Sequence, residues 1–211
     1  MPEPYDLHPS VAYVQSILSN LEVRTGRSLK AWTALVQAEA PADAKARVAW
    51  LKAQGLGATQ AALVAQRAGA EPGHAFDDTP EGYLAAAPGY VEAQYGGRKA
   101  ALRPLFEQLA AAVRGLGTDV KVCPCETIVP FYRNHVFAQV KPFASRLDLG
   151  LALGDPAAVE DPSGRLQDTG GFRRKDRLTH KLEIVSDIDV AAALPWLQRA
   201  YERDGDRDGT S

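Results

Sequence analysis

The stretch Arg146-Leu147-Asp148-Leu149-Gly150-Leu151-Ala152-Leu153 decides the fold of the second half of this chain. A leucine stands at every second position, and side chains alternate between two faces along a β-strand. The four leucines are therefore expected on one apolar face, and the residues between them on the other. The pattern predicts a strand whose second face is open to water, a ligand or a partner.

The same alternation recurs on both sides of this stretch, and strands are expected at residues 119–123, 127–133, 135–140 and 179–185. In 135–140, parity puts Val136 and Val140 on one face and Phe137 and Gln139 on the other. Short connections favour an antiparallel meander, and the helical regions on either side would cover its leucine face. The predicted fold class is α+β: an N-terminal helical bundle, then a two-layer domain whose antiparallel sheet is covered on one face by helices.

Composition shifts predict the domain boundaries. Four short helical patterns fill residues 1–70, and we expect them to form a bundle packed around Trp32 and Trp50. Proline, glycine and acidic residues dominate 71–87, so this segment is interpreted as a linker. The sheet domain is expected at 88–203, and the charged, glycine-rich residues 204–211 are expected to be a disordered tail.

Length and charge bound the class of protein. The chain has 211 residues, a net charge of −2 and two cysteines. No apolar run approaches the roughly 18 residues needed to cross a bilayer, and the N-terminus lacks the basic start and apolar core of a signal peptide. We therefore expect a cytoplasmic protein with no membrane partner. The slightly acidic balance does not favour nucleic acid as a partner, although a local basic patch is compatible with it.

Two resemblances follow from particular stretches. Residues 132–140, Tyr-Arg-Asn-His-Val-Phe-Ala-Gln-Val, together with 146–151 and 196–201, resemble a bacterial domain of unknown function, number 5655. Thr25-Gly26, Trp32 and residues 50–52 resemble a helical domain of unknown function, number 4287, that is often joined to the first. These resemblances imply two domains and a bacterial, cytoplasmic setting. They imply no activity and no catalytic residues.

The residue types that carry catalysis are few. Cys123-Pro124-Cys125 has one residue between its thiols, which is tighter than common zinc spacing, and no second cysteine pair exists. His135 sits by an expected turn, and His180 is expected to face the core. We therefore expect no metal, no cofactor and no catalytic residue. An enzyme that uses Asp148 with one of these histidines stays open as an alternative.

A long connection after the leucine strand is the best functional candidate. Residues 154–178 form a 25-residue segment without a period, and residues 165–181 contain six basic residues against two aspartates. Guanidinium groups bind carboxylates and phosphates through paired hydrogen bonds, and an aromatic neighbour can stack on a ring. The simpler interpretation is a solvated surface loop. The predicted ligand site combines this loop with the open sheet face: Arg133, Phe137, Gln139, Lys141, Arg146, Asp148, Phe172, Arg173 and Arg174.

The leading hypothesis is a non-enzymatic binding or accessory protein. It would take an anionic small molecule or an acidic protein segment on the open sheet face and the basic loop. The alternatives are a nucleic-acid-binding protein and an enzyme with an unrecognised site. The sequence leaves the oligomeric state open.

Overall fold

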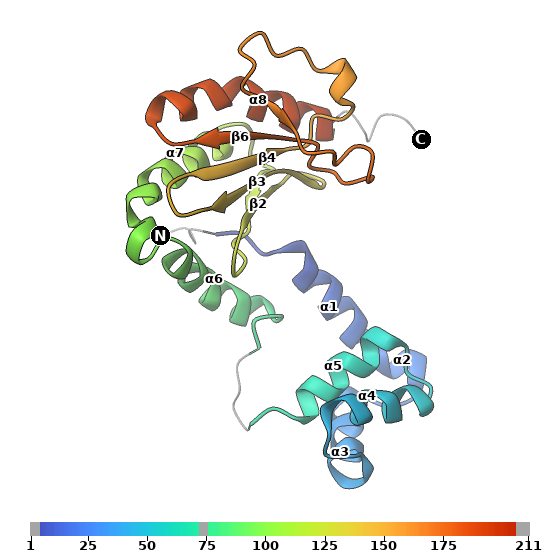
Figure 1. The fold of residues 1–211 in the computed structure, drawn as a ribbon. Helices are drawn as coiled ribbons and strands as arrows, with labels where there is room; N and C mark the ends of the chain where they lie inside the picture. The colour runs from blue at the N-terminus through green and yellow to red at the C-terminus, as the bar shows by residue number, and fades with distance from the viewer. Residues whose placement is uncertain (1–4, 72–75, 206–211) are drawn as a thin grey trace. The chain divides into compact units, whose positions relative to one another are not determined.

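The computed structural model describes residues 5–71 and 76–205, and these residues form two compact units. One unit is Pro9–Tyr83, and the other combines Met1–His8 with Leu84–Ser211 (Figure 1). The expected bundle over 1–70 differs from this division at its start, because the described residues 5–8 belong with the sheet. Hydrogen bonds between Asp6 and β1 are the physical reason, and they are described below.

The N-terminal unit is a helical bundle, as predicted. Its helices are α1 (Pro9–Ser19), α2 (Leu21–Thr25), α3 (Leu29–Glu39), α4 (Ala44–Ala53) and α5 (Ala58–Ala68). Trp32 and Leu51 are buried in its core, and Trp50 packs against that core while partly exposed. Side-chain oxygens of Ser28 and Asp43 accept hydrogen bonds from the first turns of α3 and α4, which fixes where these helices begin.

Helix α6 (Pro80–Gln94) corrects the expected linker over 71–87. Thr79 Oγ1 accepts a hydrogen bond from Gly82 N at 3.1 Å, and Pro80 starts the helix where a missing N–H costs nothing. Proline and glycine in this region suggested a loop, but packing of its apolar side chains, such as Val91, stabilises the helix. Residues 72–75 of that expected linker lie outside the described residues.

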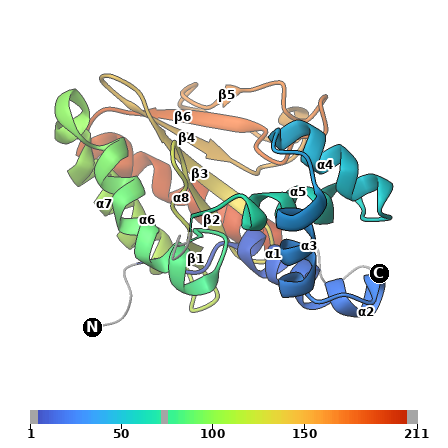
Figure 2. The same ribbon diagram turned by 90° about the horizontal axis from the view of Figure 1, so that it is seen from below.

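Six strands form one antiparallel sheet in the C-terminal unit (Figures 1 and 2). They are β1 (Lys121–Val122), β2 (Val129–Tyr132), β3 (Val136–Pro142), β4 (Leu147–Leu151), β5 (Gln167–Asp168) and β6 (His180–Ile184), in the order β1-β2-β3-β4-β6-β5. The 3₁₀ helix η1 (Gly97–Leu102) and α7 (Arg103–Arg114) precede the sheet, and α8 (Asp187–Gly205) follows it. The predicted α+β class is confirmed.

The leucine face of β4 is the centre of the core. Leu147, Leu149 and Leu151 are fully buried, and they share one cluster with apolar residues of α7 and α8, including Phe106 and Leu197. Both helices therefore cover the same face of the sheet, as the alternation predicted.

Phe137 is a correction to the predicted face assignment. Tyr132 pairs with Val136 and Phe131 pairs with Ala138, so Phe137 is an extra residue in a β-bulge. The bulge turns its ring into the core, where the side chain is 0% exposed and lies edge-on to Tyr201 of α8. Phe137 therefore cannot belong to a site on the open face.

The start of the chain closes the β1 edge of the sheet. Asp6 N donates to Val122 O at 3.0 Å, and Val122 N donates to the Asp6 carboxylate at 2.8 Å. An exposed strand edge presents unpaired backbone groups, and these two bonds satisfy a pair of them.

The structure also changes the expected loop and tail. Residues 154–178 include the 3₁₀ helix η2 (Pro156–Ala158) and the edge strand β5, so the segment is not wholly irregular. Helix α8 continues to Gly205, and Asp204, which we assigned to a disordered tail, is only 4% exposed. Its carboxylate accepts several hydrogen bonds, which holds this last turn in place. Residues 206–211 of the expected tail lie outside the described residues.

Candidate functional site

The open face of the sheet holds a set of charges that neutralise one another. Asp148 contacts Arg146 Nε at 2.8 Å and Lys181 Nζ at 3.2 Å. Glu183 lies 3.4 Å from each of the same two cations. Gln139 and the exposed Lys141 occupy the neighbouring strand, opposite Gly150 and Asp148. The structure brings the four predicted residues of this face together, but Arg146 already has acidic partners.

Arg133 is not part of this group. Its Nε lies 2.7 Å from the Asp119 carboxylate, and its guanidinium lies 4.3 Å from the centre of the Tyr201 ring. Tyr201 belongs to α8, on the covered side of the sheet, and its hydroxyl donates to Asp119 at 2.6 Å. That hydrogen bond, followed by the one from Arg133, holds the pKa of Asp119 below its ordinary value. Including Arg133 in an open-face site was wrong.

A hollow of about 480 Å³ opens beside the end of β4, and we call it the loop pocket. Three segments meet there: the loop 172–179, the residues just after β4, and the last turn of α8. Its lining residues are Ala152, Gly154, Phe172, Lys175, Asp176, Arg177, Thr179, Arg203 and Asp204. This is the part of the unit where loop cations and a concave surface coincide.

Asp204 is the anchor of the loop pocket. Its carboxylate accepts hydrogen bonds from Asn134 N at 2.9 Å and His135 N at 2.8 Å, and from Arg177 Nη2 at 2.8 Å. These donors compensate the charge of a nearly buried carboxylate. Another donor of Arg177, its Nε, is buried and has no hydrogen-bond partner in the part of the chain that the structure describes. A buried donor without an acceptor costs free energy.

Unlike Arg177, the other two cations of the loop pocket have no partner among the residues that the structure describes. The side chains of Lys175 and Arg203 make no ion pair or hydrogen bond with any residue among 5–71 and 76–205. Arg203 lies against the backbone of Gly154, where an added Cβ would be 2.4 Å from its Nη2. Gly154 also has φ +86°, a conformation that favours glycine. Because glycine has no Cβ, the Arg203 guanidinium can occupy this position next to the backbone.

Of the three predicted loop residues, the structure places Phe172 at the loop pocket and Arg173 and Arg174 outside its lining. Phe172 lines the loop pocket with 46% of its surface exposed. Arg173 instead lies 3.5 Å from Asp168 with its side chain 83% exposed, and Arg174 donates to Thr169 O at 3.0 Å. Neither lines the hollow. Arg203 lies within the expected sheet domain 88–203 but was not singled out, because the sequence alone does not show that it lines the same hollow as the loop.

Both cysteines are at least partly buried, and His135 and His180 lie close to other polar side chains. Burial raises the pKa of the Cys123 thiol to about 12 and also raises that of Cys125, so both thiols are protonated near neutral pH. His180 Nδ1 lies 2.8 Å from Thr179 Oγ1, and burial lowers its pKa. His135 Nδ1 lies 3.3 Å from Asp204, and Asp148 bonds to other groups. Within the described ranges, no three His, Cys, Asp or Glu side chains are arranged to hold a metal ion.

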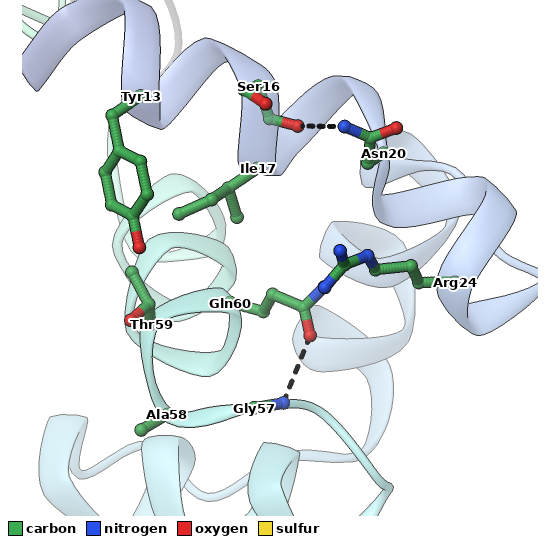
Figure 3. A pocket seen from close by; sticks show the side chains of 9 residues that line it. All are labelled: Tyr13, Ser16, Ile17, Asn20, Arg24, Gly57, Ala58, Thr59 and Gln60. Atoms are coloured by element: carbon green, nitrogen blue, oxygen red, sulfur yellow. Dashed lines mark hydrogen bonds between the residues drawn. The ribbon is translucent and has the colours of Figure 1, made fainter. Parts of the chain in front are cut away.

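The N-terminal unit has a hollow of its own, of about 370 Å³, between α1, α2 and the start of α5 (Figure 3). Two of its polar side chains bond locally: Gln60 Oε1 accepts from Gly57 N at 3.1 Å, and Asn20 Nδ2 donates to Ser16 O at 2.8 Å. Arg24 is the one charged residue that lines it. The loop pocket therefore combines more cationic groups in one place.

Comparison with known proteins follows the division into two units. None of the helices in the described part of the chain is long and apolar enough to span a bilayer. Searches of curated proteins and of solved structures returned no significant match. The family model of a second domain of unknown function, DUF4287, matches residues 14–68, within the helical bundle. The family model described as Domain of unknown function (DUF5655) matches residues 91–204, more than half of the sequence, and the chain therefore belongs to the DUF5655 family.

Proposed function

We propose that the C-terminal unit binds a small anionic molecule in the loop pocket and serves as a non-enzymatic binding or accessory protein. The observation that carries the proposal is an excess of positive charge in a hollow, whose lining has the three cations Lys175, Arg177 and Arg203 against the two carboxylates Asp176 and Asp204. Asp204 is compensated by Arg177 and by backbone N–H groups, whereas Lys175 and Arg203 have no partner among the described residues. An anion in the loop pocket would compensate both.

The shape of the site supports a small molecule over an acidic protein segment. A volume of about 480 Å³ falls within the range of small-molecule sites, which are concave and have a few convergent polar groups. On the open sheet face, by contrast, Asp148 and Glu183 already pair with Arg146 and Lys181. The proposal therefore moves the predicted anion site from that face to the end of β4.

Calorimetric titration with inorganic phosphate, citrate and monophosphorylated metabolites tests the proposal. A hydrogen bond to a charged group contributes about 1.5–3 kcal/mol, so Arg203→Ser and Lys175→Ser should each weaken binding about tenfold or more. Arg173→Ser and Arg174→Ser are matched controls, because they remove the same charge from the same loop outside the hollow. If Arg203→Ser binds every anion as tightly as the wild type, the loop pocket is not the site.

A nucleic acid is the alternative ligand, because Arg173 projects into solvent beside Arg174 and Lys175. Such binding weakens steeply with salt, since each neutralised phosphate releases counterions. Gel shift of labelled DNA and RNA at 50 and 200 mM salt separates the two. The alternative would be favoured if the protein shifts a labelled nucleic acid, and if Arg173→Ser weakens that binding while Arg203→Ser does not.

A further inference from the structure

We propose that the ligand of the loop pocket is a planar ring that carries a phosphate group, with the ring against Phe172; this inference rests on the proposed anion site. Phe172 and the three cations Lys175, Arg177 and Arg203 line one hollow. The ring of Phe172 is 46% exposed, which leaves apolar surface in water at the wall of a charged pocket. A ligand with an aromatic and an anionic part uses both features.

The size of the hollow points to a ligand larger than a bare anion. Inorganic phosphate has only five heavy atoms, and it would leave most of about 480 Å³ unfilled. Beyond the cations the lining includes Asp176, Thr179 and Asp204, and also Ala152, Gly154 and Phe172, which offer room and a stacking surface. A flat ring joined to the anionic group fits this remainder, because any heterocycle has a face that stacks on phenylalanine.

The cations favour a phosphate as the anionic group. Two guanidinium groups and an ammonium supply many N–H donors, and a dianionic phosphate has three terminal oxygens to accept them. The guanidinium groups are fixed from two elements: Asp204 holds Arg177 at 2.8 Å, and Gly154 gives space to Arg203. Lys175, at φ +59°, completes the group from the tip of the loop.

Titration with four probes tests the inference: inorganic phosphate, ribose phosphate, adenosine and adenosine monophosphate. We expect adenosine monophosphate to bind most tightly. Phe172→Ala should weaken it about tenfold, which is within the range measured for loss of one stacking partner, and should leave ribose phosphate unchanged. Phe172→Trp should retain the affinity, and its added indole should change fluorescence on titration. Phe143→Ala is the matched control, since Phe143 is 37% exposed but lies beside Arg146.

The outcomes separate this inference from the proposed function. If ribose phosphate and adenosine monophosphate bind with equal affinity and Phe172→Ala has no effect, the proposed ring contact is wrong but the anion site stands. The same conclusion holds if only citrate binds and Arg203→Ser abolishes that binding. If no anion binds the wild type, both are wrong. Thermal melting of Phe172→Ala checks that the variant folds, and Phe172→Trp tests the ring without removing it.

Discussion

Asp204 shows how one buried carboxylate holds separate segments together. It binds the turn after β2 through two backbone N–H groups and the basic loop through Arg177. We predict that Asp204→Asn lowers the free energy of unfolding of the C-terminal unit by about 3–5 kcal/mol, because it leaves Arg177 without its ion-pair partner. Urea denaturation measures this change. Asp176→Asn, at an exposed position of the same loop, should change stability by less than about 0.5 kcal/mol. Equal effects of the two variants would contradict the anchoring role.

His180 gives the stability of this unit a pH dependence. Burial is the main cause that lowers its pKa below the ordinary 6.5, so the unfolded chain takes up a proton more readily than the folded one. The stability is therefore complete above about pH 6.5 and falls as the pH drops through the pKa of the folded state. Urea titrations between pH 7.5 and 5 should show this fall. His180→Gln should flatten it, after allowance for His8, whose pKa burial also lowers. If the free energy of unfolding of His180→Gln depends on pH as steeply as that of the wild type, other titrating groups cause the pH dependence.

At the scale of residues, alternation predicted burial well where the backbone is regular. Leu147, Leu149 and Leu151 are buried, and Asp148 is on the opposite face. Phe137 fails the same rule because a bulge adds one residue and reverses parity, and the sequence has no glycine or other signal for it. Asp204 was missed because charge and glycine content suggested a disordered tail from residue 204, whereas its hydrogen bonds come from distant segments. Arg203, inside the expected domain, was missed because its neighbour Gly154 is also distant in the sequence.

Gly154 links the end of β4 to the arrangement of the loop pocket. We predict that Gly154→Ala destabilises the unit by about 1–3 kcal/mol, since alanine is strained at φ +86° and its Cβ would displace Arg203. Gly164→Ala is a matched control, because Gly164 has φ +64° but nothing lies within 4 Å of an added Cβ. Both variants should lose stability, measured by thermal melting. Only Gly154→Ala should also lower the affinity of the loop pocket for the anion. An equal loss of affinity in Gly164→Ala would refute the steric explanation.

At the scale of elements, periodicity located five of the six strands that the structure describes, and four helical patterns in residues 1–70 where the structure has the five helices α1 to α5. The exceptions are β5, whose two residues are too few for a period, and α6, whose proline and glycine content suggested a linker. Tertiary contacts decide both: β5 pairs with β6 across Asp168 and His180, and α6 buries Ala87 and Val91. Local composition carries no information about these partners.

At the scale of the whole chain, the order along the sequence and the units of structure do not coincide. The described residues 5–8 belong with the sheet, the chain then forms the helical unit, and it returns to the sheet unit at Leu84. Composition predicted two domains but not this return, because Asp6 shows its role only through its bonds to Val122. Each unit has a core cluster of its own, one around Leu51 and one around Leu149.

Separate cores lead to a prediction about the unfolding of the full chain. Leu51 and Leu149 are both fully buried, and replacing such a leucine by alanine costs about 2–5 kcal/mol. We expect Leu51→Ala to speed amide hydrogen exchange within residues 9–83 only, and Leu149→Ala within residues 84–205 only, because each cavity weakens the cluster that surrounds it. Hydrogen exchange followed by mass spectrometry on the intact protein resolves the two regions. The pair of variants is its own control, since the substitution is the same and only the core differs. Faster exchange across both regions in either variant would show that the two cores open as one cooperative unit.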